Sequence, residues 1–162
     1  MTEDRDSASR QRPSGPFRWF AAMEYYAFIL NRTFKVFISD HMLCGAKVRG
    51  LVASPRMTTP VMSEQDFWVS SRLGQFYDQL DPESKEFLEI ESSNFQIDYQ
   101  EIVTIDYVSG KKWGMGRVPH SGRILLNLRN GRVRELILLG RQNGDDLKQS
   151  IEKSICARPS QT

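Results

Sequence analysis

The chain has 162 residues, of which 40% are hydrophobic and 26% are charged, and its formal net charge is +2. These values fit an ordinary globular domain and exclude a disordered chain, and so small a net charge does not indicate a nucleic-acid partner. Cys44 and Cys156 are too few for a disulfide framework, so we expect a reducing, cytoplasmic setting.

The N-terminal region predicts a disordered tail followed by a helix. Residues 1–15 are polar and carry mixed charges, which is typical of a flexible segment. Apolar side chains recur at helical spacing in residues 17–30, and a strand is the alternative because the run is rich in aromatic residues. This run contains Arg18 and Glu24 and is shorter than the roughly 20 apolar residues that cross a bilayer. We therefore do not expect a transmembrane protein. The sequence of this run is compatible with transient association with a membrane surface.

A β-hairpin is predicted next. Apolar and polar residues alternate in 33–38 and again in 42–48, which is typical of half-buried strands. Asp40 and His41 lie between the two runs and predict the turn.

Residues 53–84 interrupt the strand pattern and predict an insertion that contains a helix. Ser63 and Asp66 have the spacing of a capping box, and the apolar residues that follow recur at helical spacing as far as Leu80. Gly74 is expected to weaken this helix by about 1 kcal/mol relative to alanine.

Five further strands are predicted after the insertion, over residues 87–90, 95–99, 103–107, 124–129 and 132–139. Asn130-Gly131 joins the last two and is the preferred sequence of a two-residue type I′ turn. That turn places Glu135 on the same side as the apolar residues, so either a bulge intervenes or this face is not fully buried.

A C-terminal helix is predicted over residues 144–156. Asn143 is suited to cap it, and an apolar seam runs along one side. The chain is thus divided into a tail (1–15), one domain (16–157) that includes the insertion, and a loose end (158–162). The fold class is α+β and mainly β, with seven antiparallel strands, a C-terminal helix, an N-terminal helical segment and a helical insertion.

This order of elements resembles the pleckstrin-homology-like (PH-like) superfold, a seven-stranded barrel or sandwich closed by a C-terminal helix. The resemblance is carried by FKVFISDHMLCGAKV, by NFQIDYQEIVTIDYV and by RILLNLRNGRVRELILLGRQNGDDLKQSIEKSI. The long insertion departs from the family pattern, as does the absence of a tryptophan from the last helix. A lipocalin-like or other small closed barrel is the alternative.

The resemblance implies a binding module for anionic lipid headgroups or for a protein partner. Members that bind lipid carry a basic residue in the first strand and a basic-x-Arg pair in the second, and Lys35, Lys47 and Arg49 have this spacing. The turn between those strands is shorter than in headgroup-binding members. The alternative is that these three side chains form a solvated outer face of the sheet.

The segment KKWGMGRVPHSGR, Lys111 to Arg123, is the most unusual stretch of the chain. Gly114 and Gly116 begin a GxGxxG pattern, but Pro119 occupies the third position and a strand follows, which excludes a nucleotide-binding loop. The segment is instead predicted to connect two strands and to bind a partner. Its candidate contact residues are Lys111, Lys112, Trp113, Arg117, His120 and Arg123.

No strong catalytic or metal-binding signature is present. His41 and Cys44 have a tolerable ligand spacing, but His120 and Cys156 are distant from them. Acid–base chemistry by His120 is the enzymatic alternative. We therefore expect no cofactor and no metal.

The charges are unevenly distributed along the chain. Residues 76–106 contain nine acidic residues and one basic residue, whereas residues 107–141 contain eight basic residues and one acidic residue. Either the two segments pair across the sheet, or a basic face meets an anionic partner. Arg129, Arg132 and Arg134 are the candidate contact residues around the last hairpin.

Together these features predict a non-enzymatic interaction or recruitment module. Its expected partner is an unknown protein or an anionic lipid surface. A small enzyme or a small-ligand barrel that uses His120 is the alternative, and it predicts a closed apolar cavity near that residue. We do not expect a nucleic-acid partner, because the strands lack exposed aromatic residues on which bases stack.

Overall fold

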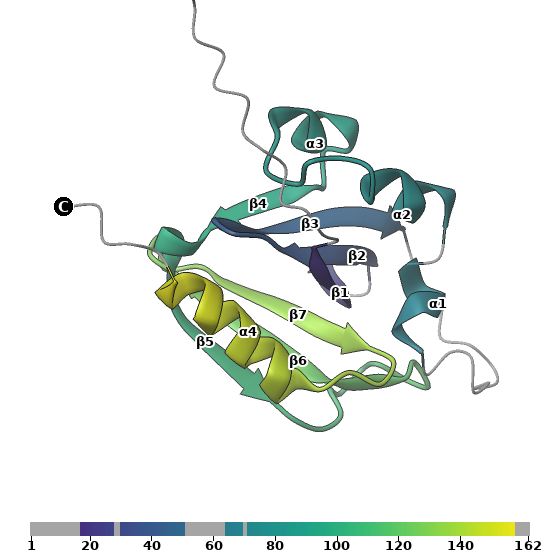
Figure 1. Ribbon diagram of the computed structural model, residues 1–162. Coiled ribbons are helices and arrows are strands. Elements are labelled where there is room, and N and C mark those ends of the chain that lie inside the picture. Colours follow the sequence, from purple (N-terminus) through teal and green to yellow (C-terminus); the bar gives the residue numbers. More distant parts are fainter. Residues whose placement is uncertain (1–16, 28–29, 51–63, 70, 158–162) are drawn as a thin grey trace, which may run out of the picture.

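The computed structural model describes residues 17–27, 30–50, 64–69 and 71–157. Within these residues, seven strands form one antiparallel sheet: β1 (Arg18–Ala27), β2 (Leu30–Ile38), β3 (Met42–Arg49), β4 (Phe95–Asp98), β5 (Ile102–Val108), β6 (His120–Leu128) and β7 (Val133–Leu139). Their order across the sheet is β4-β3-β2-β1-β7-β6-β5. β1 pairs with both β2 and β7 and so joins the two halves of the sheet, which curls into a half-barrel with β4 and β5 as its edges (Figure 1).

The described helices cover both faces of this sheet. They are α1 (Gln65–Val69), α2 (Arg72–Tyr77), α3 (Lys85–Ile90) and α4 (Gly144–Cys156), and a 3₁₀ turn (Tyr99–Glu101) follows β4. Figure 1 shows α4 lying along β5, β6 and β7, whereas α2 and α3 lie beside β3 and β4. The predicted mainly antiparallel α+β fold with a C-terminal helix is therefore confirmed. The number of strands also agrees, but only because β1 takes the place of the strand predicted for residues 87–90.

Two hydrophobic cores result, one on each face of the sheet. The core on the concave face includes Phe34, Phe95 and Ile124, and Leu147 and Ile151 of α4 complete it as the predicted apolar seam. The core on the other face joins the sheet to the short helices and to the loop between β5 and β6. Its members include Met23, Trp68, Tyr77, Phe87, Met115 and Val118.

The helix predicted for residues 17–30 is wrong, since β1 is a strand that pairs with β2 from Arg18↔Ile38 to Ala27↔Leu30. The centre of β1 is buried on both faces, because Phe20 lies in one core and Ala21 in the other. A strand buried on both faces reads as a continuous apolar run and shows no alternation of period two. Its sequence signal was therefore ambiguous.

The strand predicted for residues 87–90 is also wrong. Ser84 accepts a hydrogen bond from the Phe87 backbone N–H at 3.2 Å and starts α3, in which Phe87 is the buried residue. A serine cap outweighs the β preference of so short an apolar run. The single helix predicted in the insertion is two helices instead, because Ser71 caps a new helix, α2. Ser63 of the predicted capping box lies outside the described residues.

The hairpin of β6 and β7 has a three-residue turn rather than the predicted two-residue turn. Leu128 N donates to Arg132 O at 2.9 Å, and Gly131 adopts a φ of 78°. This geometry is a turn with a glycine bulge, which shifts the register by one residue. Leu136 then lies opposite Ile124 in the concave core, and Glu135 lies opposite Leu125 on the other face. The bulge is thus the alternative that occurs.

The remaining local predictions are confirmed. β2 and β3 form a hairpin in which the Ser39 N–H donates to Met42 O at 3.2 Å. The predicted strands 95–99 and 103–107 correspond to β4 and β5. Asn143 caps α4 by accepting a hydrogen bond from the Asp146 N–H at 3.2 Å.

Candidate functional site

The loop between β5 and β6, residues 109–119, is fastened to the body of the protein by two buried side chains. Met115 and Val118 belong to the core beneath α1, and the Tyr25 hydroxyl donates to Met115 Sδ at 3.6 Å. Gly114 and Gly116 have φ values of 88° and 57°, which turn the chain on either side of Met115. At the end of the loop, Gly140 N donates to Pro119 O at 2.9 Å.

His120 links the two ends of this loop. Its Nδ1 lies 2.8 Å from Val118 O, and its Nε2 accepts a hydrogen bond from the Lys112 N–H at 2.8 Å. Both contacts are satisfied when the ring is neutral and carries its proton on Nδ1. Both ring nitrogens are therefore occupied by the loop itself. This arrangement weakens the predicted role of His120 in acid–base chemistry, because neither nitrogen faces an open position.

Glu135 holds the base of the loop. Lys112 Nζ lies 2.7 and 2.9 Å from its two carboxylate oxygens, and Arg123 Nε lies 3.3 Å from Oε1. The predicted contact residues Lys112 and Arg123 are thus engaged in an ion-pair network within the molecule. Their charges fix the loop on β6 and β7.

Trp113 is the large aromatic residue that this anchored loop exposes to solvent. Its side chain is 97% exposed, although tryptophan is usually well buried in folded proteins. Lys111 and Arg117, on either side of it in the sequence, are exposed as well. A large aromatic side chain on an anchored loop loses little conformational freedom when a partner covers it. The loop therefore forms the most prominent candidate contact surface, which we call the Trp113 loop (residues 109–119).

The second predicted group, Lys35, Lys47 and Arg49, does not form a solvated face. Lys35 is buried, with Nζ 2.5 Å from Asp78 Oδ1 and 4.5 Å from the centre of the Trp19 ring. Lys47 Nζ lies 3.4 Å from Glu91 Oε1. Arg49 donates to Phe67 O at 3.1 Å. The oxygen atoms that these three cations contact belong to α1 and to the residues that directly follow α2 and α3, so the cations hold these helices against the sheet.

Most of the Arg134 side chain is covered by its neighbours rather than presented to a partner. Its guanidinium lies 3.4 Å from the centre of the Phe95 ring, and NH2 donates to Glu24 Oε2 at 2.9 Å. Arg32 shares the same carboxylate oxygen at 3.2 Å. Burial lowers the pKa of Arg134, and Glu24 partly offsets this effect. Sequence reasoning missed this cluster, since 110 residues separate Glu24 from Arg134.

The other two arginines of the last hairpin lie at its exposed end. Arg129 Nε donates to Gln100 O at 2.5 Å, and its backbone N–H donates to Glu101 O at 2.8 Å. Arg132 is exposed, and its backbone N–H donates to Asn130 Oδ1 at 3.0 Å. Arg129 thus joins the hairpin to the 3₁₀ turn after β4.

A polar cluster at the turn between β2 and β3 was also missed. Glu83 Oε1 lies 2.7 Å from Ser39 Oγ and accepts a hydrogen bond from the His41 N–H at 3.0 Å. Burial by itself raises the pKa of the Glu83 carboxyl, but the hydrogen bonds from Ser39 and His41 outweigh it, so this pKa lies below its usual value. The cluster closes the turn onto the insertion.

Cys44, beside that turn, is suited neither to catalysis nor to metal binding. Its side chain is fully buried, and burial raises the pKa of the thiol to about 12. A thiol is a nucleophile or a metal ligand only as the thiolate. Among the residues that the structure describes, no group of three or more histidine, cysteine or acidic side chains is placed to hold a metal ion.

We expect Glu83→Gln to reduce the loss of unfolding free energy that occurs when the pH falls below about 4.5. The folded-state pKa of Glu83 lies below the ordinary value of 4.5, so its contribution is complete above that pH and is lost as the pH falls through the folded value. Urea unfolding measured in steps between about pH 3 and pH 7 provides the test. Glu89→Gln, an exposed change on α3, is the matched control. If the free energy of unfolding depended on pH in the same way for the wild type and Glu83→Gln, the lowered pKa assigned to Glu83 would be contradicted.

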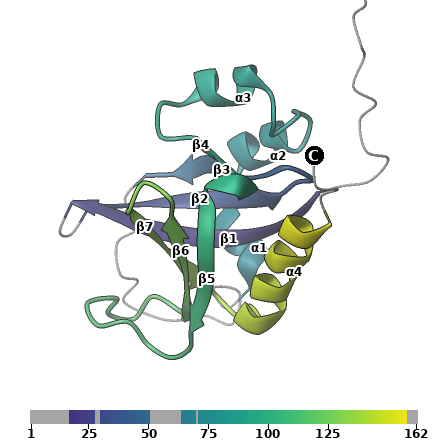
Figure 2. The ribbon, with the colours of Figure 1, turned by 90° about the vertical axis from the view of Figure 1, so that its left-hand side faces the viewer.

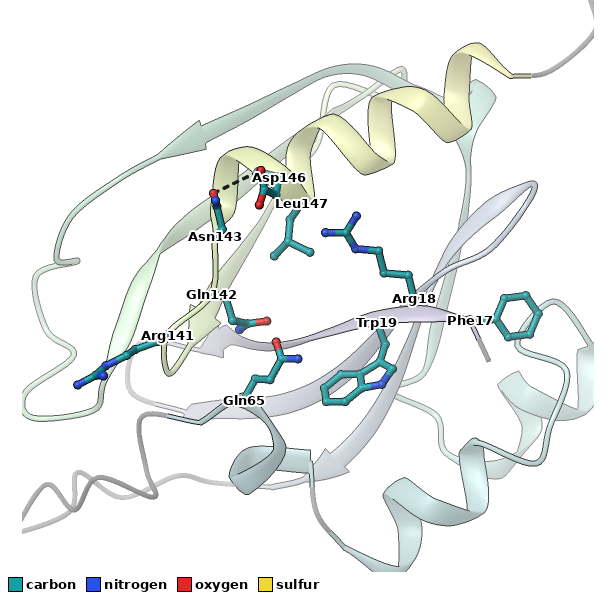
Figure 3. Close-up of a pocket in the computed structure, with 9 residues that line it drawn as sticks. All are labelled: Phe17, Arg18, Trp19, Gln65, Arg141, Gln142, Asn143, Asp146 and Leu147. Carbon is teal, nitrogen blue, oxygen red and sulfur yellow. Dashed lines mark hydrogen bonds between the residues drawn. The ribbon is translucent and has the colours of Figure 1, made fainter. Parts of the chain in front are cut away.

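A pocket of about 510 Å³ opens elsewhere, between the start of β1 and the start of α4 (Figure 3). Arg18 points into it in Figure 3 and donates to Ser150 Oγ. The Gln142 amide pairs with the Ala21 backbone, accepting from N at 3.2 Å and donating to O at 2.7 Å. The lining residues are Phe17, Arg18, Trp19, Gln65, Arg141, Gln142, Asn143, Asp146 and Leu147. This pocket has a mixed polar and apolar lining and does not include His120, so it is not the apolar cavity predicted near that residue.

Comparisons with known proteins leave the chain without a family. No family model matches the sequence, and no curated protein is significantly similar to it. A solved structure, the C-terminal domain of an unknown protein from Leishmania infantum, aligns at a TM-score of 0.47 with 12% identity, over 88% of this chain and 84% of that one. Among the described helices, none is both long and apolar enough to cross a membrane.

Proposed function

We propose that the protein is a non-enzymatic, PH-like interaction module that binds a protein partner through the Trp113 loop. The observation that carries the proposal is the exposure of Trp113 on a loop whose other contacts are made within the molecule. Tryptophan is enriched among the residues that dominate binding energy at protein interfaces. An anchored loop also reduces the entropy lost on binding.

Two features support the PH-like part of the proposal. The sheet is open between β4 and β5, the strands at the ends of the order β4-β3-β2-β1-β7-β6-β5. The C-terminal helix α4 packs its apolar seam into the concave core between the two halves of the sheet. A barrel of seven strands that is closed by its last helix is what the resemblance implies.

The distribution of cations favours a protein over an anionic lipid surface. Each basic residue near such a surface contributes about 1 kcal/mol, so all four cations in and beside the loop would contribute about 4 kcal/mol. Lys112 and Arg123 are already paired with Glu135, which reduces this to at most about 2 kcal/mol. Millimolar affinity alone requires about 4 kcal/mol. The loop therefore holds too little charge for stable attachment to a membrane.

Photo-crosslinking inside the source cells tests the proposal. A photoreactive phenylalanine analogue replaces Trp113 in one variant and Val103, which is 59% exposed on β5, in a control variant. We expect discrete protein adducts from position 113 that are absent from position 103 and are suppressed by an excess of unlabelled wild-type protein. Vesicles containing acidic lipid form the second arm. Salt-sensitive co-sedimentation that Trp113→Ala abolishes, without protein adducts, would overturn the proposal in favour of a lipid surface.

A further inference from the structure

We propose that the partner of the Trp113 loop is a second copy of this chain, which the loop contacts on helix α2. This inference rests on the proposed function, because it names the partner of the same loop. Three observations support it: an exposed apolar surface on α2, opposite charges around that surface and around the Trp113 loop, and the large separation of the two surfaces on one molecule.

Helix α2 carries two large apolar side chains on its outer side. Leu73 is 38% exposed and Phe76 is 45% exposed. They are three residues apart, so both lie on the same side of the helix. Gly74 and Tyr77 are buried and attach the helix to the sheet. We call Leu73 and Phe76 the α2 face, and an aromatic side chain such as Trp113 is of the right chemistry to cover it.

The surroundings of the two surfaces have opposite charge. Residues 71–91, which contain α2 and α3, hold six acidic and two basic residues, whereas residues 109–123 hold four basic residues and no acidic residue. Some of these charges are paired internally, as Lys35 with Asp78 and Lys112 with Glu135. Among the exposed charges the contrast is smaller but has the same sign. Asp81, Glu86 and Glu89 outnumber Arg72 and Lys85 around α2 and α3, whereas the Trp113 loop exposes the cation Lys111. Such complementarity steers encounter and fixes orientation more than it adds affinity.

The two surfaces lie far apart on one molecule. In both views, α2 and α3 lie at one end and the connection between β5 and β6 lies at the other (Figures 1 and 2). The loop of one copy therefore meets the α2 face of the next copy in a head-to-tail contact. Such a contact does not close on itself and produces chains of copies. A contact centred on three side chains is small, so the association is weak and depends on concentration and salt.

Sedimentation equilibrium of the full chain, from about 10 µM to about 1 mM, measures this association. We expect the weight-average mass of the wild type to rise above the 18.7 kDa of one copy and to pass that of a dimer at the highest concentration. Raising the salt to about 0.5 M is expected to reverse the rise. Trp113→Ala and Phe76→Glu, each alone, are expected to weaken the association at least about tenfold.

Mixing the two variants makes the test specific. Phe76→Glu keeps its loop and Trp113→Ala keeps its α2 face, so an equimolar mixture is expected to form dimers and nothing larger. Val133→Glu changes an exposed apolar residue outside both surfaces and is expected to associate like the wild type. Circular dichroism establishes that each variant is folded, and Leu73→Glu replaces Phe76→Glu if that variant is not.

The possible failures are distinguishable. A wild type that stays at the mass of one copy at every concentration overturns the self-docking inference. If position 113 still yields protein adducts in cells, the proposed function stands and the partner is a different protein. Association that Trp113→Ala abolishes but the α2 variants do not would overturn the assignment of the α2 face.

Discussion

Replacing Glu24 with glutamine is expected to lower the free energy of unfolding by about 3 kcal/mol, and the melting temperature by about 6–12 °C. The Glu24 carboxylate forms ion pairs with both Arg32 and Arg134, and the Glu24 side chain is only 15% exposed. Arg134 is 18% exposed and is stacked on Phe95 across the concave core, so it cannot move into water without breaking that stack. The substitution leaves two neighbouring guanidinium groups with no negative charge to balance them.

Glu152→Gln is the matched control for this experiment. Glu152 pairs with Lys148 one turn away on α4, at 3.7 Å, and both side chains are substantially exposed. Such pairs contribute about 0.3–0.5 kcal/mol, so the same chemical change is expected to be nearly neutral there. Urea unfolding at pH 7 measures both variants. Equal, small effects at the two positions would show that the buried cluster does not stabilise the fold.

Replacing Gly45 with alanine is expected to cost about 2–3 kcal/mol. Gly45 lies opposite Phe95 in the ladder of β3 and β4, and a Cβ atom placed on it would lie 2.0 Å from the edge of the Phe95 ring. That ring is not free to move aside, because Arg134 stacks on its face and Phe34 meets its edge with centroids 5.2 Å apart. The strain is therefore expected to reach the Glu24 cluster as well.

Gly50→Ala provides the comparison. Gly50 follows β3 directly, and no atom lies within 4 Å of the position that its Cβ would occupy. A change of less than about 0.5 kcal/mol is expected there. If Gly45→Ala were as stable as Gly50→Ala, the packing of Phe95 against the β3 backbone would be wrong. A double variant with Glu24→Gln that loses less than the sum of the two single effects would support their coupling through Phe95.

Local signals predicted the parts of the fold that local interactions determine. The hairpin of β2 and β3 and the helix α4, with its Asn143 cap, follow from alternation and capping within a few residues. β1 was not recognised because both of its faces are buried, and this depends on the pairing with β7, more than 100 residues away. The register of β6 and β7 was left open between a bulge and a partly exposed face, because the turn at Gly131 contains one residue more than the preferred type.

The sequence identified the residues of the candidate site but not the contacts that hold them in place. The unusual segment around Trp113 was recognised from its residues, and the exposure of Trp113 fits a contact role. The ion pairs that Lys112 and Arg123 make with Glu135 depend on the register of β7, which the sequence did not provide. Lys35 was predicted to contact an anionic ligand or, alternatively, to lie on a solvated outer face. Its acidic partner, Asp78, was not foreseen because it lies in the insertion, whose position over the sheet no local pattern indicates.

The central claim is that Trp113 is exposed on a rigid loop that forms a binding surface for a partner. Backbone relaxation measured by NMR tests this claim most directly. With the anchors at Met115, Val118 and His120 in place, the amides of residues 111–118 are expected to have order parameters near those of β6, about 0.85. His120→Ala is expected to lower them, while the Trp113 indole stays exposed. Order parameters below about 0.6 across the wild-type loop would contradict the account, because a mobile loop presents no prepared contact surface.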